Sequence, residues 1–185
     1  MKISIKNMVC NRCISAVEAI FDELKIHISD IILGEVEIKD EISENDLTKL
    51  NSRLKSTGFE ILEDSSKKQI EKIKNLIIQK ISEEDISEDF VLTEFLSFEL
   101  NKDYSAISKL FSQNETVTLE QYFILQKIEK VKELLLYKEF NLTEISLKLG
   151  YKSVQHLSSQ FRKITGFSPT QFINSKEKRI ALDKI

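Results

Sequence analysis

Apolar residues recur three and four positions apart along most of the chain, and this spacing predicts a largely helical protein. Two short stripes of this kind lie near the carboxyl end; they consist of Leu142, Ile145 and Leu149, and of Leu157, Phe161 and Ile164. Gly150 ends the first stripe, since glycine enters a left-handed turn without strain. Ser153 can cap the next helix, which Gly166 closes. The pattern predicts two helices around a tight turn, then a third helix opened by Ser168 and Pro169.

The second helix of this pair has a polar face opposite its apolar stripe. At about 100° per residue, that face carries Gln155, Ser159, Arg162 and Lys163. Glutamine can form two hydrogen bonds to adenine, arginine can contact guanine or a phosphate, and lysine neutralises phosphate. Lys152, in the turn, is a further candidate contact. Such a face on a helix-turn-helix makes double-stranded DNA the first partner to consider.

The stretch GYKSVQHLSSQFRKITGFSPTQF, residues 150–172, resembles the signature of the AraC/XylS family of bacterial transcription regulators. The resemblance rests on the Gly-aromatic turn, on the spacing of Leu157 and Phe161, and on the Gly-Phe-Ser-Pro ending. It implies two helix-turn-helix units, joined by a long helix, that bind promoter DNA and regulate transcription. It leaves open RNA polymerase as a further partner.

A first copy of the unit is expected upstream, and the sequence contains one. Residues 92–100 predict its first helix, Asn101 lies in the turn, and Asp103 caps its second helix. Asn101 stands where the family commonly has glycine, and asparagine tolerates that turn. The resemblance carries Ser105 and Lys109, on the outward face, over as DNA contacts.

Two further helices are predicted around the first copy. Thr118 can cap a long helix whose apolar positions, from Tyr122 to Leu135, repeat at helical spacing and correspond to the family's linker. Upstream, the stripe from Ile70 to Ile81 predicts another helix. The expected limits are about 91–113 and 141–165 for the two helix-turn-helix units and about 118–137 for the linker helix.

The first 64 residues show a different pattern, in which short alternating runs predict strands. Gly34 separates two such runs, and the predicted order is strand, helix, strand, strand, helix, strand. This βαββαβ order is the ferredoxin-like arrangement. The polar run EDSSKK at 63–68 marks the joint. The predicted fold class is α+β, with a ferredoxin-like domain at 1–64 and an all-α DNA-binding domain at 65–185.

The loop after the first predicted strand contains the motif M-x-C-x-x-C, with Met8, Cys10 and Cys13. Together with the βαββαβ order, this motif resembles the heavy-metal-associated domain of copper chaperones and metal-transporting ATPases. The resemblance implies that the two cysteines bind a soft metal, Cu(I) or Zn(II). It also implies that Met8 anchors the loop beneath the site and that Phe59 shields it. Asn7 stands where the family has glycine, and it can adopt the same backbone conformation.

Three interpretations of Cys10 and Cys13 stay open: a metal site, a redox-active dithiol, and a loop without chemical function. A closed structural zinc site is not expected, because the chain has two Cys and two His, and His27 and His156 lie in different domains. The alternative function is a metallochaperone-like or interaction protein whose first domain mediates docking or dimerisation. A homodimer is therefore an open assembly state.

Charge separates the two ends of the chain. Residues 141–185 hold eight Lys or Arg against three acids, whereas residues 1–66 hold eight against thirteen, and the whole chain carries −3. Because phosphate binding requires cations, DNA binding is expected of the carboxyl-terminal domain. Lys176, Lys178 and Arg179 fit either phosphate contacts or a solvated tail.

The sequence favours no enzyme, since it contains no phosphate-binding glycine loop and no plausible Ser-His-acid set. It also has no apolar run long enough to span a membrane, and the amino end lacks the plan of a signal peptide. A cytoplasmic protein is therefore expected, and its cysteines would stay reduced.

Overall fold

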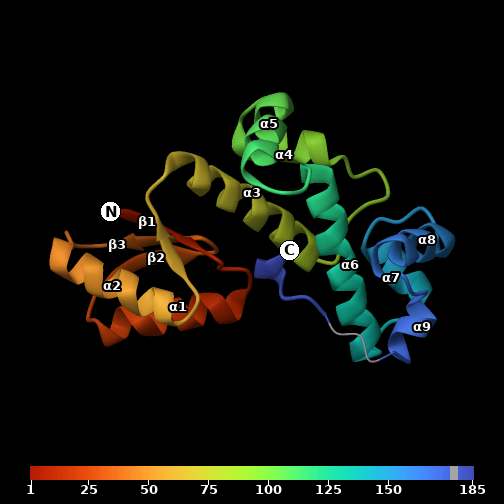
Figure 1. Ribbon diagram of the computed structural model, residues 1–185, viewed down its shortest axis with the longest axis horizontal. Coiled ribbons are helices and arrows are strands. Elements are labelled where there is room, and N and C mark those ends of the chain that lie inside the picture. Colours follow the sequence, from red (N-terminus) through yellow and green to blue (C-terminus); the bar gives the residue numbers. More distant parts are fainter. Residues whose placement is uncertain (176–178) are drawn as a thin grey trace. The chain divides into compact units, whose positions relative to one another are not determined.

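The computed structural model describes residues 1–175 and 179–185. The chain divides into two compact units, Met1–Asn75 and Leu76–Ile185 (Figure 1). The first unit contains a four-stranded antiparallel sheet and two helices in βαββαβ order, and the second unit is built from helices. The predicted α+β fold class is therefore confirmed. None of the described helices is long and apolar enough to cross a membrane.

The elements of the first unit follow the predicted order. They are β1 (Lys2–Lys6), α1 (Asn11–Glu23), β2 (Ile28–Ile32), β3 (Glu35–Ile38), α2 (Glu44–Ser56) and β4 (Glu60–Leu62). The sheet order is β2-β3-β1-β4, so β1 lies between β3 and β4. Ile3 pairs with Val36 across β1 and β3, and Ile5 pairs with Ile61 across β1 and β4. This register puts alternate apolar side chains on one face of the sheet.

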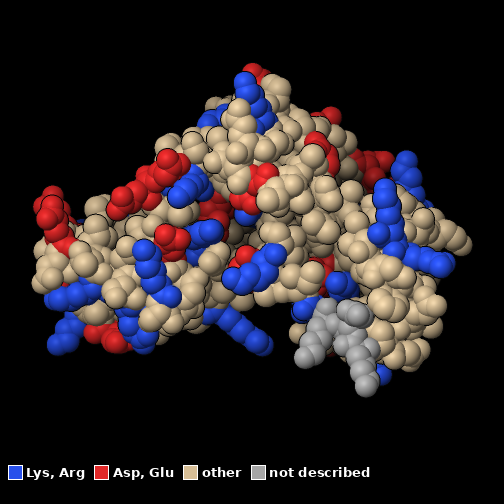
Figure 2. All heavy atoms as spheres, in the orientation of Figure 1, with Lys and Arg blue, Asp and Glu red and all other residues tan. Residues whose placement is uncertain are grey.

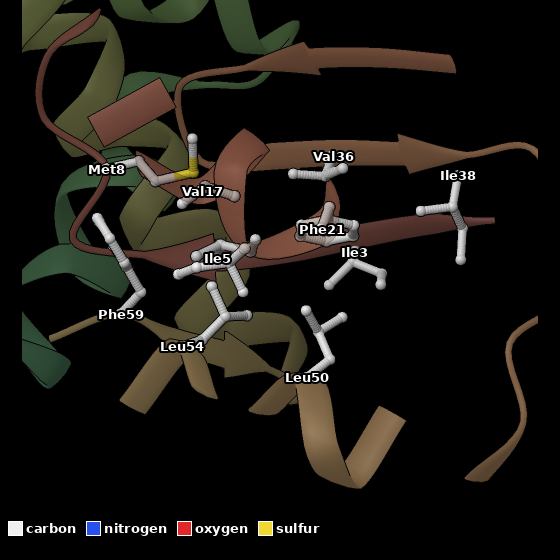
Figure 3. Close-up of a cluster of buried hydrophobic side chains, with 11 residues drawn as sticks. Ile3, Ile5, Met8, Val17, Phe21, Val36, Ile38, Leu50, Leu54 and Phe59 are labelled. Atoms are coloured by element: carbon white, nitrogen blue, oxygen red, sulfur yellow. The ribbon is translucent and has the colours of Figure 1, made fainter. Parts of the chain in front are cut away.

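The core of the first unit lies between that face of the sheet and the two helices (Figure 3). Val17 and Phe21 of α1 and Leu50 and Leu54 of α2 are fully buried in it. Met8, which precedes α1, joins the same core with 0% of its surface exposed. The cysteine-containing loop is therefore anchored from below by Met8, as the sequence predicted.

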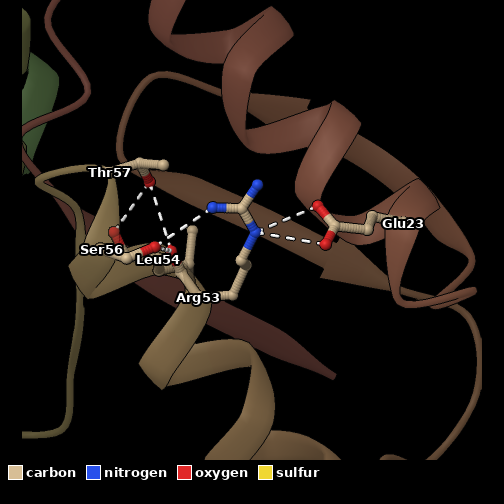
Figure 4. A network of polar contacts seen from close by, with 5 residues as sticks. All are labelled: Glu23, Arg53, Leu54, Ser56 and Thr57. Atoms are coloured by element: carbon tan, nitrogen blue, oxygen red, sulfur yellow. Dashed lines mark hydrogen bonds and ion pairs between the residues drawn. The ribbon is translucent and has the colours of Figure 1, made fainter.

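A surface ion pair connects α1 with α2 (Figure 4). The Nε atom of Arg53 donates to both carboxylate oxygens of Glu23, at 3.3 and 3.1 Å. Arg53 also donates to the Ser56 hydroxyl at 3.2 Å, and the Thr57 hydroxyl donates to the Leu54 carbonyl at 2.9 Å. Because Arg53 and Glu23 are both about half exposed, their pair adds little stability. The buried core is therefore what holds the two helices.

A long helix, α3 (Ser65–Ser82), contributes to both units, because the division between them falls after Asn75. The side chain of Asp64 caps α3 by accepting from the amide of Lys67 at 2.9 Å. The buried isoleucines of α3 are Ile70, Ile73, Ile77, Ile78 and Ile81. The sequence placed the joint between the domains at residues 63–68. The helix α3 begins within this segment, at Ser65.

The second unit consists of two helix pairs joined by a long helix. Its elements are α4 (Leu92–Leu100), α5 (Tyr104–Asn114), α6 (Leu119–Tyr137), α7 (Leu142–Lys148), α8 (Val154–Thr165), α9 (Pro169–Ile173) and a short 3-10 turn, η1 (Leu182–Lys184). The predicted linker helix is α6, and Thr118 caps it by accepting from the amide of Gln121 at 3.2 Å. Ser153 and Ser168 cap α8 and α9 in the same way, as the sequence predicted.

Four polar or charged side chains of α6 are buried alongside its apolar residues. They are Gln126, Lys127, Glu129 and Lys132. Glu129 pairs with Lys132 and accepts from the amide of Ile180 at 2.9 Å. The Gln126 amide donates to the carbonyl of Leu182 at 3.2 Å. The carboxyl-terminal residues therefore cover one side of α6 and provide partners for its polar groups.

Candidate nucleic-acid interface and cysteine loop

The second helix-turn-helix is formed by α7 and α8 around Gly150. Asn141 opens α7 with a capping box: its side chain accepts from the Glu144 amide at 3.0 Å, and the Glu144 carboxylate accepts from the Asn141 amide at 2.7 Å. Gly150 has a φ of +64°, in the left-handed region that favours glycine. A Cβ there would lie 2.7 Å from the Ser87 carbonyl oxygen and 2.8 Å from Cγ2 of Ile86. The turn therefore needs glycine both for its backbone conformation and for its close packing.

The α8 helix presents the predicted polar face to solvent. Leu157 and Phe161 are fully buried, and the Phe161 ring packs edge-on against Phe172 of α9 with 5.5 Å between centroids. The predicted contact residues on the opposite side are all exposed: Lys152, Gln155, Ser159, Arg162 and Lys163. Figure 2 shows Lys and Arg side chains projecting over the region that Figure 1 labels α7 and α8. This face is therefore accessible to a polyanion.

Tyr151 supports the amino end of α8 from the turn, a role that sequence reasoning missed. It is 3% exposed, and its hydroxyl donates to the side-chain oxygen of Gln160 at 2.8 Å. Its ring meets the His156 ring in a T-shaped contact with 5.4 Å between centroids. Burial raises the pKa of Tyr151 above its ordinary value, so the hydroxyl keeps its proton. These contacts fix the end of the helix where Gln155 lies.

The first helix-turn-helix repeats this plan with α4 and α5. Asn101 takes the place of Gly150 and has a φ of +48°, which confirms that asparagine tolerates the turn. Asp103 stands at the N-cap position of α5, but its side chain forms no capping hydrogen bond, contrary to expectation. Ser105 and Lys109 are exposed on α5. The buried stripe of the helix is formed by Ile107 and Phe111.

Tyr104, the first residue of α5, is tied to α6. Its hydroxyl donates to the carboxylate of Glu120. Partial burial and this carboxylate raise the pKa of Tyr104, whereas the same hydrogen bond lowers the pKa of Glu120. The donor therefore stays protonated and the acceptor stays charged around neutral pH. The contact fixes the amino end of α5 to the linker helix.

Glu84, just beyond α3, connects α6 with α7. Its carboxylate accepts from Lys130 of α6 at 2.9 Å and from Lys148 of α7 at 3.3 Å. Burial by itself would raise the pKa of Glu84, but the two lysines hold it below its ordinary value. Lys130 also pairs with Glu133 at 2.9 Å. The ion pairs therefore join three segments of the second unit through one carboxylate.

The sequence singled out three basic residues of the carboxyl-terminal segment, Lys176, Lys178 and Arg179. Arg179 donates to Glu133 of α6 at 2.7 Å, so its guanidinium has a partner within the protein. This ion pair contradicts a solvated tail, one of the two roles that the sequence left open for Arg179, whereas a phosphate contact stays a prediction. Lys176 and Lys178, to which the same two roles were assigned, lie outside the described residues.

Cys10 and Cys13 lie at the start of α1, with their Sγ atoms 3.6 Å apart. Cys10 is exposed at the N-cap position, and Cys13 is partly buried in the first turn. Burial raises the pKa of the Cys13 thiol above its ordinary value, so this group favours the protonated form. Within residues 1–175 and 179–185, no cluster of three or more His, Cys, Asp or Glu residues is placed to hold a metal ion. The two thiols would therefore supply two of the four donors that a tetrahedral ion takes.

The loop that leads to Cys10 is held in place at Asn7. This residue has a φ of +71°, the conformation expected where it replaces glycine. Its side-chain amide donates to the carbonyl of Gly58 at 2.8 Å, and its backbone N–H donates to the carboxylate of Glu71 at 2.7 Å. Glu71 lies in α3 and is buried. No sequence pattern predicts this contact, because 64 positions separate Asn7 from Glu71.

Comparison with known proteins finds matches to the second unit. Residues 96–175 match the family model described as a helix-turn-helix domain. The C-terminal domain of AraT, a response regulator from Geobacillus stearothermophilus, is 23% identical, with a TM-score of 0.50 over 60% of this chain and 90% of that chain. The C-terminal domain of the response regulator yesN from Fusobacterium nucleatum is 28% identical, with a TM-score of 0.48 over 56% and 95% of the two chains. A transcriptional regulator from Chromobacterium violaceum with an AraC-type DNA-binding domain is 16% identical, with a TM-score of 0.47 over 56% and 90%.

A comparison with curated proteins found no match. The likeness to the AraT domain supports the helical fold of the second unit, and the family match confirms a helix-turn-helix domain at residues 96–175. The family match does not extend to the first unit, whose likeness to heavy-metal-associated domains remains a resemblance.

Proposed function

We propose that this protein, whose residues 96–175 match a helix-turn-helix family, is an AraC-type transcription regulator that binds promoter DNA with both of its helix-turn-helices. The observation that carries the proposal is the repeated arrangement, in which α5 and α8 each bury one face and expose a polar one. These two helices would enter successive major-groove segments, about 34 Å apart along the DNA. One chain would then read an extended site, and no palindrome is required.

In this proposal the second helix-turn-helix, α7 and α8, supplies most of the sequence preference. Gln155, Ser159 and Arg162 would contact base edges, with Gln155 suited to adenine and Arg162 to guanine. Lys163 and Lys152 would contact phosphates, which adds affinity without sequence preference. All five side chains are exposed on or next to α8.

The first helix-turn-helix, α4 and α5, would contribute less discrimination between bases. Counting from the two N-caps, Ser105 occupies the position of Gln155, and Lys109 the position of Ser159. A serine hydroxyl bonds several kinds of base edge, so it distinguishes them weakly. Lys109 can contact guanine or a phosphate. We therefore expect the half-site under α5 to tolerate more base changes than the half-site under α8.

Selection of bound sequences from random duplex DNA tests this proposal. The expected motif has two parts about one helical turn apart. Arg162→Ala should remove a guanine preference in one part and weaken binding by about 1–3 kcal/mol. The matched control is Ser112→Ala, at the equivalent position of α5, which should leave that preference intact. Binding without any selected motif would contradict the proposal.

A finer part of the proposal concerns control: a soft metal ion held by Cys10 and Cys13 would set the activity of the DNA-binding domain. Two thiolates that share a tetrahedral ion with bonds of about 2.3 Å lie about 3.8 Å apart. The two Sγ atoms are 3.6 Å apart, and the approach to Cys10 is open. Sulfur donors of this kind suit Cu(I) or Zn(II). The missing ligands would have to come from solvent, a small thiol or a second copy of the chain.

Metal control requires that the ion bind the DNA-competent and incompetent states with different affinities. The test is a DNA-binding titration of the full chain with Zn(II), Cu(I) or chelator, alongside the variant that combines Cys10→Ser and Cys13→Ser. We expect metal to change the DNA affinity of the unaltered protein at least about fivefold and to have no effect on the variant. If saturating metal leaves both proteins unchanged, the sensor proposal fails. The first unit would then be better described as a docking or dimerisation module.

A further inference from the structure

We propose that Glu71 transmits the state of the cysteine loop to α3, and that Glu84, beyond the other end of this helix, passes the change on to α6 and α7. The inference rests on the proposed function, since it names the route by which the cysteine pair would regulate DNA binding. It assigns a role to two acidic residues that no motif singles out.

The first step of the route is the hydrogen bond between Asn7 and Glu71. The backbone N–H of Asn7 lies 2.7 Å from the Glu71 carboxylate, whose side chain belongs to a residue with 7% of its surface exposed. A hydrogen bond to a charged acceptor is stronger than one between neutral groups, and a buried carboxylate is poorly compensated by water when it loses a donor. Breaking this bond would therefore favour rearrangement of α3 around Glu71.

The loop has few other ways to absorb a movement of the sulfur atoms. Met8 is fixed in the core, and the Cys10 carbonyl accepts from the amides of Cys13 and Ile14 at 2.9 and 3.3 Å. Disulfide formation would bring the Sγ atoms from 3.6 Å to about 2.05 Å. Asn7 is a non-glycine residue in the left-handed region, so its conformation persists only while its contacts hold it. We therefore expect any movement that Met8 and Val9 do not absorb to break the contacts of Asn7.

The second step lies beyond the other end of α3. Glu84 accepts from Lys130 and Lys148, and the Ile86 amide donates to the Lys148 carbonyl at 3.0 Å. Ile86 in turn lies against Gly150, at the turn between α7 and α8. A change at the end of α3 therefore reaches the turn that positions α8.

The route acts as a switch only if a disulfide between Cys10 and Cys13 changes how often α3 opens by local unfolding. With the Asn7 hydrogen bond made, Glu71 is held to the loop; with the bond broken, that part of α3 loses a partner and opens more often. Continuity of contacts alone does not demonstrate coupling, so the proposal requires a measured response that depends on Glu71.

Hydrogen exchange of the full chain, read by mass spectrometry, provides this measurement. The pair is closed without metal by glutathione disulfide: one sulfur–sulfur bond forms between Cys10 and Cys13, the bond of the oxidant breaks, and two glutathione thiols take up the two protons. We expect amides of α3, of residues 83–91 and of α7 to exchange about fivefold faster after closure. In Glu71→Gln, closure should still occur, but the change in exchange should fall below about twofold.

Two controls separate this inference from the proposals on which it rests. Glu18→Gln removes an exposed carboxylate from α1 and should leave the response as in the unaltered protein. Glu84→Gln should keep the response within α3 and lose it in α7. An unchanged α3 after complete closure, or a full response in Glu71→Gln, would overturn the inference. Because the pair is closed by oxidation and read without DNA, failure of metal binding or of DNA binding would appear separately.

Discussion

The ammonium group of Lys127 lies 3.8 Å from the centroid of the Tyr151 ring. The contact joins the linker helix to the turn of the second helix-turn-helix, and the Phe123 ring is also within reach, at 5.5 Å. Lys127 is buried, and this burial lowers its pKa to about 8, whereas the two rings favour its charged form. One lysine therefore makes the stability of the second unit depend on pH.

Lys127→Met should stabilise the protein near neutral pH. In the unfolded chain the ammonium has its ordinary pKa of 10.5, against about 8 in the folded protein, so the unfolded state binds more protons between these values. Stability should therefore rise as the pH increases from about 8 to about 10.5. The variant should lose this slope and gain about 1–2 kcal/mol near pH 7, since the lost cation–π contacts offset part of the relief. Urea denaturation near pH 7 and near pH 10 measures both quantities.

Lys152→Met is the matched control, because it removes an exposed lysine from the neighbouring turn. It should leave the pH dependence of unfolding unchanged. A less stable Lys127→Met variant with the original pH slope would mean that the aromatic contacts outweigh the burial of the charge.

Gly150→Ala should destabilise the protein more than Gly166→Ala. Both glycines have positive φ, +64° and +80°, so alanine at either site costs about 1 kcal/mol of backbone strain. A Cβ at Gly166 would meet nothing within 4 Å, whereas one at Gly150 would overlap Ser87 and Ile86. The overlap should add about 1–3 kcal/mol. Equal losses in thermal or urea unfolding would show that the turn can shift away from Ile86.

Removal of residues 179–185 should destabilise the second unit without changing the DNA motif. The deletion takes the Ile180 amide from Glu129, the Leu182 carbonyl from Gln126, and Arg179 from Glu133. Loss of a hydrogen-bond partner from a buried charged group costs about 1–3 kcal/mol. Denaturation should show this loss, and sequence selection should return the original motif. Unaltered stability would show that water replaces these contacts at no cost.

Lys163→Ala should weaken binding to all DNA sequences alike. If the exposed ammonium contacts a phosphate, its loss should reduce the slope of log affinity against log salt by about one unit. Fluorescence anisotropy at several salt concentrations measures the slope on a selected site and on an unrelated duplex. A change confined to the selected site would instead assign Lys163 to a base edge.

Local signals were sufficient to predict most of the secondary structure. Ser153, Ser168 and Thr118 act as caps, and Asn101 adopts the left-handed conformation expected at its turn. These features depend on a few neighbouring residues, so they can be recognised without the fold. Alternation in the first 64 residues likewise predicted the strands, because a strand with one buried face has a period of two.

Long-range polar contacts were beyond the reach of the sequence. Nothing in the sequence marks Gln126 and Glu129 as buried, but residues more than 50 positions away in the chain provide hydrogen-bond partners for them. Glu71 and Glu84 look like ordinary acids of an exposed helix, yet one holds the cysteine loop and the other holds two lysines. Such roles arise only when distant segments meet, which no local pattern records. The geometry of the cysteine pair could be predicted from its spacing, but the anchor at Glu71 could not.

The helix α3 also limits where the chain can be divided to build chimeras with other proteins. A chimera joined at residue 64 would separate Ile70 and Ile73 from the unit in which they are buried. A chimera joined within α3, after Asn75, would interrupt a continuous helix. A junction in residues 83–91 would keep the helix whole. That junction would, however, remove Ile77, Ile78 and Ile81, which are buried and belong to the second unit, so neither half can be transferred without part of the core of the other.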